Sequence, residues 1–214
     1  FVMTRSYVFL VSLALIGLVS VQPSTEAVRQ SDSQWTTLFD GSSLDGWNVL
    51  GEGTWELVDG AVQGDGDPGF LVTSESYGDF QLTFEYWIEA DTSNSGVFIR
   101  SGPDLALSPD GLRLVTGYEV QISNARRDDS HCTGSLYGFT AVKPRPDESA
   151  DRWHTFEIRC QNNQITVKSD GLKCIDFDQS TNEKTKKKPL KGYIGLQDHG
   201  SDCWYRNIKL RVLK

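Results

Sequence analysis

The feature that most constrains this chain is a short strand pattern, alternating apolar and polar residues, which recurs along most of its length. Its clearest copy is GYEVQI at 117–122. Successive side chains of a strand point to opposite faces, so Tyr118, Val120 and Ile122 would enter a core. Glu119 and Gln121 would then share the other face, about 7 Å apart, or two strand rises.

Two further stretches have the same build. The segment 94–100 reads NSGVFIR and is expected to turn its valine and isoleucine inward and Arg100 outward. The segment 192–200 reads GYIGLQDHG, with Gln197 and His199 on the face opposite the apolar residues. We predict that these polar faces line one concave site. The alternative is that each is the solvated side of a half-exposed sheet.

The rest of the chain repeats this alternation. Asp59-Gly60 lies between two short alternating runs and predicts a hairpin. The segment 79–88 alternates over ten residues and places Glu85 on its outward side. No stretch after residue 30 has a convincing helical period. Short strands separated by glycine turns predict an all-β sandwich in a single domain.

The first residues have the order of a secretory signal peptide. Arg5 precedes an apolar run at 8–21, and small or polar residues follow up to Ala27. The alternative is an uncleaved anchor, but an apolar run of about 14 residues is short of the ~20 that span a bilayer. We therefore predict a signal peptide over 1–27, a folded domain over 31–214 and export to the periplasm or beyond, with no membrane association after cleavage.

Charge and cysteines limit the partners. The net charge of −8 disfavours nucleic acid, whose binding depends on lysine and arginine neutralising phosphates. Four cysteines, at 132, 160, 174 and 203, allow three pairings in an oxidising compartment. A Cys132–Cys203 bridge would tie together loops beside two of the strands above, whereas Cys160 and Cys174 are expected on strands too far apart. No cysteine and histidine spacing typical of zinc occurs.

Several motifs, in order and near their expected spacing, carry a resemblance to a known family. They include LFDGSSLDGW at 38–47, NSGVFIR at 94–100, GYEVQI at 117–122, TGSLYG at 133–138 and GLQDHG at 195–200. Over about residues 35–213 the chain resembles the 3-keto-disaccharide hydrolase domain family. The resemblance implies a concanavalin A-like jelly-roll β-sandwich of two antiparallel sheets and a role in bacterial carbohydrate metabolism.

The resemblance also implies a substrate, a glycoside already oxidised at sugar carbon 3. That ketone acidifies the hydrogen on carbon 2, and the enolate left after its removal can expel the glycosidic oxygen from carbon 1, before water adds. Such a site needs a base, a group that stabilises the enolate oxygen and a proton for the leaving group.

The polar faces supply candidates for each role. Glu119 or His199 could be the base, and Arg100 could stabilise the enolate oxygen. A single divalent metal ion held by Glu119 and His199, with Gln197 nearby, is the alternative stabiliser. Tyr137 could donate to the leaving oxygen. The side chains expected to bind the saccharide substrate are Gln121, Gln197, Tyr137 and Glu85. Of the other histidines, we expect His154 to be structural and His131 to be solvated.

Two other functions compete with this one. A retaining glycosidase needs two carboxylates about 5–5.5 Å apart, but the 117–122 strand offers Glu119 followed by an amide. A non-catalytic, lectin-like module would stack sugar rings on exposed indoles, for which Trp47, Trp87 and Trp204 are candidates. The sequence does not indicate the oligomeric state.

Overall fold

The computed structural model describes residues 34–214, with gaps at 109–110, 126–127 and 201–202. The signal peptide predicted over 1–27 lies outside the described residues. Within them, no helix is long and apolar enough to cross a membrane.

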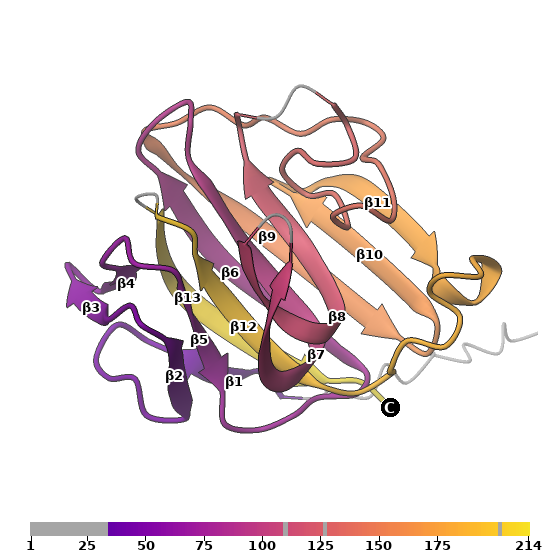
Figure 1. Ribbon diagram of the computed structural model, residues 1–214, viewed down its shortest axis with the longest axis horizontal. Helices are drawn as coiled ribbons and strands as arrows, with labels where there is room; N and C mark the ends of the chain where they lie inside the picture. The colour runs from indigo at the N-terminus through magenta and orange to yellow at the C-terminus, as the bar shows by residue number, and fades with distance from the viewer. Residues whose placement is uncertain (1–33, 109–110, 126–127, 201–202) are drawn as a thin grey trace, which may run out of the picture. The chain divides into compact units, whose positions relative to one another are not determined.

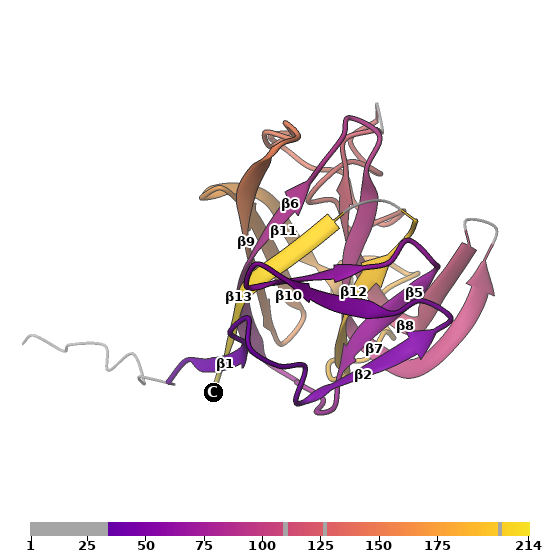
Figure 2. The same cartoon turned by 90° about the vertical axis from the view of Figure 1, so that its left-hand side faces the viewer.

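The described residues form two antiparallel sheets packed face to face (Figures 1 and 2). Sheet A has the order β11-β10-β9-β6-β13-β4-β3, with β1 also paired to β13, and sheet B has the order β2-β5-β12-β7-β8. The predicted all-β, jelly-roll sandwich is confirmed. The strands are β1 (Thr36–Phe39), β2 (Trp47–Gly51), β3 (Trp55–Val58), β4 (Ala61–Gly64), β5 (Gly69–Thr73), β6 (Phe80–Ile88), β7 (Asn94–Ser108), β8 (Gly111–Ser123), β9 (Arg152–Gln161), β10 (Gln164–Ser169), β11 (Leu172–Asp178), β12 (Tyr193–Asp198) and β13 (Cys203–Val212), with one 3₁₀ turn, η1 (Gln179–Thr181).

Strict alternation builds the core between the sheets. In β6 every second side chain from Phe80 to Ile88 is buried, and the residues between them are only half-buried. The inward residues of β7, β8 and β12 meet them from sheet B in a single apolar cluster. Each large apolar side chain buried this way stabilises the fold by roughly 1.5–3 kcal/mol. The alternation therefore fixes which residues are left on the two outer faces.

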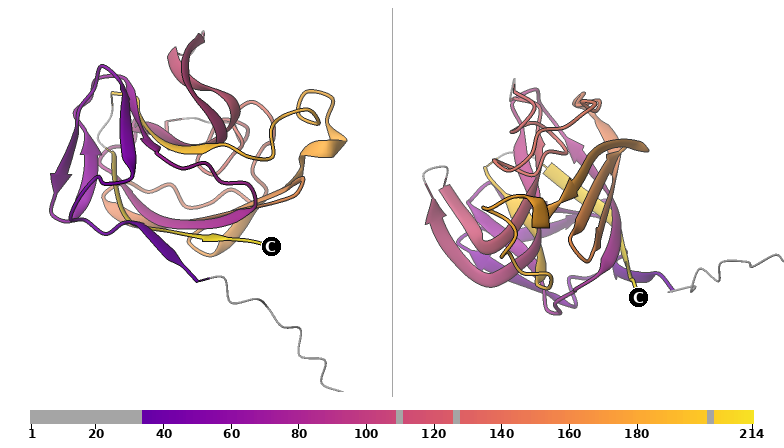
Figure 3. Two further views of the ribbon diagram at one scale, coloured as in Figure 1. Left: turned by 90° about the horizontal axis from the view of Figure 1, so that it is seen from below. Right: turned by 90° about the vertical axis from the view of Figure 1, so that its right-hand side faces the viewer.

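The long β7–β8 hairpin is the main departure from a plain sandwich. Its register shifts between Ser101 and Leu105, and the hairpin bends out of sheet B and curves back along the outer face of that sheet (Figures 2 and 3). Leu114 of the returning strand joins Phe70, Val72 and Phe98 in a second, smaller apolar cluster. The hairpin is thereby held against the outer face of sheet B.

An additional chain segment runs along the free edge of β8. The backbone N–H of Tyr137 donates to the carbonyl of Glu119 (3.0 Å), and that of Gln121 donates to Ser135 (3.0 Å). Leu136 pairs with Val120 in an antiparallel bridge. Because directly paired residues share a face, Tyr137 lies on the same outer face as Glu119.

None of the four cysteines is bridged, so the expected Cys132–Cys203 disulfide is wrong. All four thiols are buried. Removal from water raises the pKa of Cys132, Cys160 and Cys203 to about 12 and that of Cys174 to about 11. The cysteines act as small apolar core residues, and their thiols are protonated at neutral pH.

This arrangement predicts that a thiol reagent such as 5,5′-dithiobis(2-nitrobenzoate) will not label the folded protein within minutes. In 6 M guanidinium all four cysteines should react at once, and reducing agent should not change the melting temperature. Labelling of fewer than four thiols in denaturant, without prior reduction, would show that a disulfide exists.

Candidate functional site

Three of the predicted side chains gather above Gly96 on the outer face of sheet B. Gly96 of β7 lies opposite Gln121 of β8, and β12 runs along its other side. A Cβ atom placed on Gly96 would lie 2.8 Å from Oε1 of Glu119 and 3.3 Å from Oε1 of Gln197. Glycine leaves room there for the carboxylate and the amide. The convergence of Glu119, Gln121 and Gln197 is therefore built into adjacent strands.

Gln121 positions the carboxylate. Its amide fits its neighbours best with the nitrogen 2.9 Å from Oε1 of Glu119 and 3.2 Å from the carbonyl of Ser95. Its oxygen then lies 3.0 Å from Oδ1 of Asn94, so the Asn94 amide must turn as well and present its nitrogen to Gln121. With the amide turned the other way its nitrogen would donate to Asn94, and its oxygen would face the carboxylate. We adopt the first orientation, with the Asn94 amide turned to match, because it relieves two contacts between acceptor oxygens, one with Glu119 and one with Ser95.

Gln197 carries a buried side-chain acceptor, its Oε1. The residue is 4% exposed, and none of the residues that the structure describes donates a hydrogen bond to this oxygen. Buried side-chain oxygens are almost always hydrogen-bonded, so an unpaired one beside a carboxylate indicates a place for a ligand donor such as a sugar hydroxyl.

Tyr137 and His199 lie at the margins of this cluster. Tyr137 shares the face of Glu119, across the edge pairing described above. His199 is exposed and follows the end of β12. A Cβ built on Gly111, at the tip of the β7–β8 hairpin, would lie 3.9 Å from Nε2 of His199. The curved hairpin thus brings its tip close to His199.

Arg100 is not in the site, and its prediction as a catalytic residue is wrong. Its backbone is left-handed (φ 52°), so the strand alternation fails at this residue. Its side chain is fully buried and donates to Asp79 Oδ1 (3.1 Å) and to the carbonyl of Asn162 (2.8 Å). Asp79 and Asn162 belong to the sheet A side, before β6 and after β9. Arg100 therefore ties the two sheets together.

Glu85 is also placed away from Glu119. It lies on the outer face of sheet A, where its carboxylate accepts from Arg206 Nε and from Asn207 (3.2 Å). The core separates the two outer faces, so its prediction as a binding residue of the Glu119 site is wrong.

The structure places a further histidine, His131, beside Tyr137, whereas the sequence predicted only that it would be solvated. The ring of His131 packs edge to face against that of Tyr137, with 4.6 Å between centroids. Its Nδ1 lies 2.6 Å from Oδ1 of Asp128. Hydrogen bonds from Ser130 and His131 hold the pKa of Asp128 well below its usual range, so this carboxylate is ionised and orients the ring. His131 is therefore a half-exposed imidazole that Asp128 holds in place beside Tyr137.

His154 has the structural place that we expected. It is fully buried, stacks on Tyr86 and lies between Asp170 and the carbonyl of Ser149, at 2.8 and 2.7 Å.

The described residues do not provide a complete set of metal ligands. The described part of the chain holds no group of three or more His, Cys, Asp or Glu side chains that could bind one. The divalent ion predicted on Glu119 and His199 stays a prediction, and the chemistry proposed here does not depend on it.

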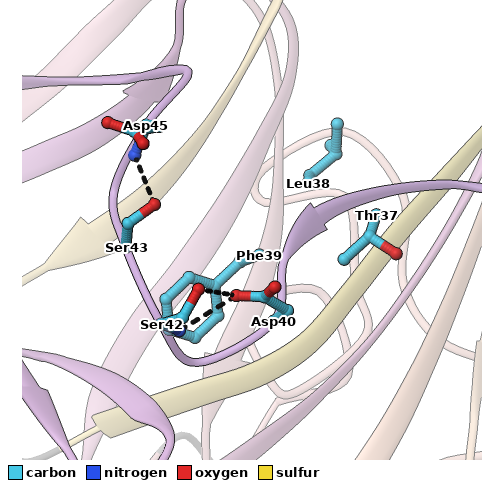
Figure 4. Close-up of a pocket in the computed structure, with 7 residues that line it drawn as sticks. All are labelled: Thr37, Leu38, Phe39, Asp40, Ser42, Ser43 and Asp45. Carbon is cyan, nitrogen blue, oxygen red and sulfur yellow. Dashed lines mark hydrogen bonds between the residues drawn. The ribbon is translucent and has the colours of Figure 1, made fainter.

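A separate small hollow of about 160 Å³ lies at the turn after β1 (Figure 4). There Asp40 accepts from the backbone N–H (2.9 Å) and the hydroxyl (2.5 Å) of Ser42. These bonds lower the pKa of Asp40 and are those of an Asx turn, which explains the residue structurally.

Comparison with known proteins identifies the family. The model of the 3-keto-alpha-glucoside-1,2-lyase-like domain matches residues 34–211. The chain belongs to this family. It is 23% identical to the 3-keto-disaccharide hydrolase of Bacteroides thetaiotaomicron, an alignment that covers 84% of this chain and 78% of that protein.

Solved structures agree with this assignment. A candidate glycosyl hydrolase from Parabacteroides distasonis superposes with a TM-score of 0.71 at 25% identity, covering 84% of this chain and all of that one. The carbohydrate-binding module CBM66 of Bacillus subtilis superposes with a TM-score of 0.56 at 17% identity, covering 78% and 95%, and shares the fold alone.

Within this 3-keto-alpha-glucoside-1,2-lyase-like domain, Gly96 offers a direct test of the cluster. A Gly96→Ala variant would force Glu119 to move, since the new methyl would lie 2.8 Å from Oε1 and 3.0 Å from Cγ. We expect about a 100-fold loss of kcat/KM on a 3-keto-glycoside, the size expected for displacing a reacting group by ~1 Å.

The matched control is Gly78→Ala, where the nearest atom to a new Cβ is 3.8 Å away and activity should be unchanged. Full activity of Gly96→Ala would show that Glu119 does not act from this position.

Proposed function

We propose that the protein is an exported hydrolase of 3-keto-glycosides, which cleaves the glycosidic bond after removing the proton on carbon 2. The observation that carries the proposal is the carboxylate of Glu119 above Gly96, next to the unsatisfied buried oxygen of Gln197. Membership of the 3-keto-alpha-glucoside-1,2-lyase-like family supports the substrate class. Gln121 and Gln197, which lie beside Glu119 on this face, carry amides and not the second carboxylate that a retaining glycosidase needs.

Glu119 is assigned as the base. The amide nitrogen of Gln121 donates to Oε1 (2.9 Å) and holds the carboxylate above Gly96, where it takes the proton from carbon 2. The electrons of that C–H bond form the enolate of the carbon 3 ketone, and its collapse breaks the bond from carbon 1 to the glycosidic oxygen. Water then adds across the double bond between carbons 1 and 2 and restores the hydrogen on carbon 2.

The proton for the leaving oxygen is assigned to the pair of Tyr137 and His131. With Nδ1 of His131 directed at Asp128, its other ring nitrogen is the one that can exchange a proton with a ligand or with Tyr137. Gln197 would accept a hydroxyl of the bound sugar. Arg100 is excluded from this chemistry because its side chain is buried among structural partners.

The decisive assay compares a 3-keto-disaccharide with the same unoxidised sugar, each with and without a chelator. We expect cleavage of the keto sugar alone. Cleavage of the unoxidised sugar would identify a glycosidase, and binding without product from either would identify a lectin-like module. The chelator arm reports on the predicted metal.

A histidine variant tests the proton donor. His131→Phe keeps a ring against Tyr137 but removes both nitrogens, and we expect kcat to fall by 10²–10⁴-fold, the typical contribution of general acid–base catalysis. An Asp128→Asn variant should keep partial activity, because the carboxylate only orients the ring. If His131→Phe retains full kcat at all pH values, the proton comes from elsewhere.

A further inference from the structure

A second hollow lies on the outer face of sheet A, away from the Glu119 cluster. It has a volume of about 380 Å³, and its lining includes Val58, Asp59, Trp87, Trp153, Trp204 and Arg206. Trp87 alternates with Tyr86 and Ile88, which enter the core. Glu119 likewise alternates with Tyr118 and Val120, which enter the core from the opposite sheet. The core between the sheets therefore separates the hollow from the proposed active site.

Three indoles form a row across the floor of this hollow. Trp87 of β6 pairs directly with Trp153 of β9 on one side and with Trp204 of β13 on the other. The rings of Trp87 and Trp204 meet edge to face, with 4.6 Å between centroids and 77° between planes. All three tryptophans are only partly buried. Three adjacent indoles on a solvent-facing row provide a large, rigid apolar surface that the core does not use.

Polar groups border the row. The guanidinium of Arg206 lies over the ring of Trp153, 3.8 Å from its centroid, and its Nε donates to Glu85. Asp59 lies at the β3–β4 turn on the rim. Arg206 is therefore held in place with its charge offset by Glu85, and the hollow combines flat apolar walls with fixed donors and acceptors.

We propose that this hollow binds a neutral saccharide of one or two pyranose rings, at a site separate from the proposed active site. The apolar C–H faces of a pyranose match the indoles, and its hydroxyls match Asp59 and Arg206. The volume is near the lower end of small-molecule sites, which suits a short ligand. The chain's net charge of −8 disfavours an acidic sugar. Trp47, which the sequence also suggested for sugar stacking, is not part of this row. It is buried, and its indole N–H donates to the carbonyl of Leu38 (2.8 Å).

Affinity electrophoresis of the full chain tests this site, with gels containing soluble starch, barley β-glucan, xylan or galactomannan. Isothermal titration with the disaccharide of the retarding glycan, a ligand of the proposed length, gives Kd. We expect at least one gel to retard the protein, and Trp204→Ala to weaken binding at least tenfold, as for a central indole contact. Val58→Arg, which places a long side chain over the rim while keeping all three indoles, should do the same.

Two controls separate this site from others. Trp35→Ala removes an exposed indole that lies against Arg211 on the same sheet and should leave binding unchanged. Glu119→Gln should also bind the saccharide as tightly as wild type, and Trp204→Ala should still cleave a small 3-keto-disaccharide. The binding site is therefore tested independently of the proposed reaction. Absence of retardation in every gel would overturn the proposal. Unchanged saccharide binding by Val58→Arg would also overturn it. A wild-type dimer in light scattering that Val58→Arg dissociates would overturn it too, because the hollow would then be the contact with a second copy of the chain.

Discussion

Glu119→Gln is expected to lower kcat on a 3-keto-disaccharide by about 10²–10⁴-fold, because an amide cannot accept the carbon 2 proton. Glutamine keeps the size of the side chain and can still hydrogen-bond to Gln121 above Gly96. KM should therefore change little, and the melting temperature should stay within about 2 °C of wild type, as for a mild surface substitution.

The matched control is Glu157→Gln, the same substitution on the outer face of sheet A, where the carboxylate pairs with Lys168 (3.2 Å). Its kcat should equal that of wild type. Steady-state kcat values measured with a purified 3-keto-disaccharide decide whether Glu119 takes part in the reaction. A Glu119→Gln enzyme with more than a tenth of wild-type kcat would remove Glu119 from the reaction and leave His199 as the predicted base.

Arg100→Leu is expected to cause the largest loss of stability, about 3–5 kcal/mol, because it truncates a fully buried side chain and removes its hydrogen bonds. Leucine would leave the carbonyl of Asn162 and the carboxylate of Asp79 without this donor, although Asp79, whose side chain is 25% exposed, still accepts from the backbone N–H of Asn162 (2.9 Å). For a chain of this size the melting temperature should fall by roughly 6–20 °C.

Urea unfolding of Arg100→Leu and of Asp79→Asn measures this effect, with Arg159→Leu as the control. Arg159 is half-buried on the outer face of sheet A. Its replacement by leucine should lower the free energy of unfolding by less than about 1 kcal/mol. Below its melting temperature, folded Arg100→Leu should retain kcat. A stable Arg100→Leu variant that has lost kcat would return Arg100 to the active site.

The alternation of side chains predicted the strands and the residues within one strand that share a face, such as Glu119 and Gln121 of β8. The strand pairing, with β7 between β8 and β12, is what places Gln197 of β12 on that face as well. It failed at Arg100 because the rule assumes extended backbone, and the left-handed φ of 52° there turns the side chain inward. Nothing in the local residues marks that position, because Arg100 follows the apolar run Val97-Phe98-Ile99, which is typical of an ordinary strand.

Glu85 shows a second limit of the pattern. Alternation within one strand separates inward from outward residues, but a sandwich has two outward faces, and only strand pairing tells which one a residue occupies. The pairing of β6 with β9 and β13 places Glu85 with Arg206, on the face opposite Glu119.

His131 shows a third limit, because its position depends on a loop. The Asp128, Ser130 and His131 spacing allows a local hydrogen-bonded turn, which was a usable signal in the sequence. Its contact with Tyr137 depends on the 133–140 segment pairing along the edge of β8, which no periodicity marks.

The most direct test of the account is the position of deuterium in the product. A 3-keto-disaccharide is cleaved in D₂O by the wild type and by Glu119→Gln, and the released keto sugar is examined by NMR at early times, against an enzyme-free sample. The account predicts one deuterium at carbon 2 for each bond cleaved by the wild type, and neither cleavage nor exchange above background with Glu119→Gln. Rapid cleavage that leaves the carbon 2 hydrogen in place would contradict it.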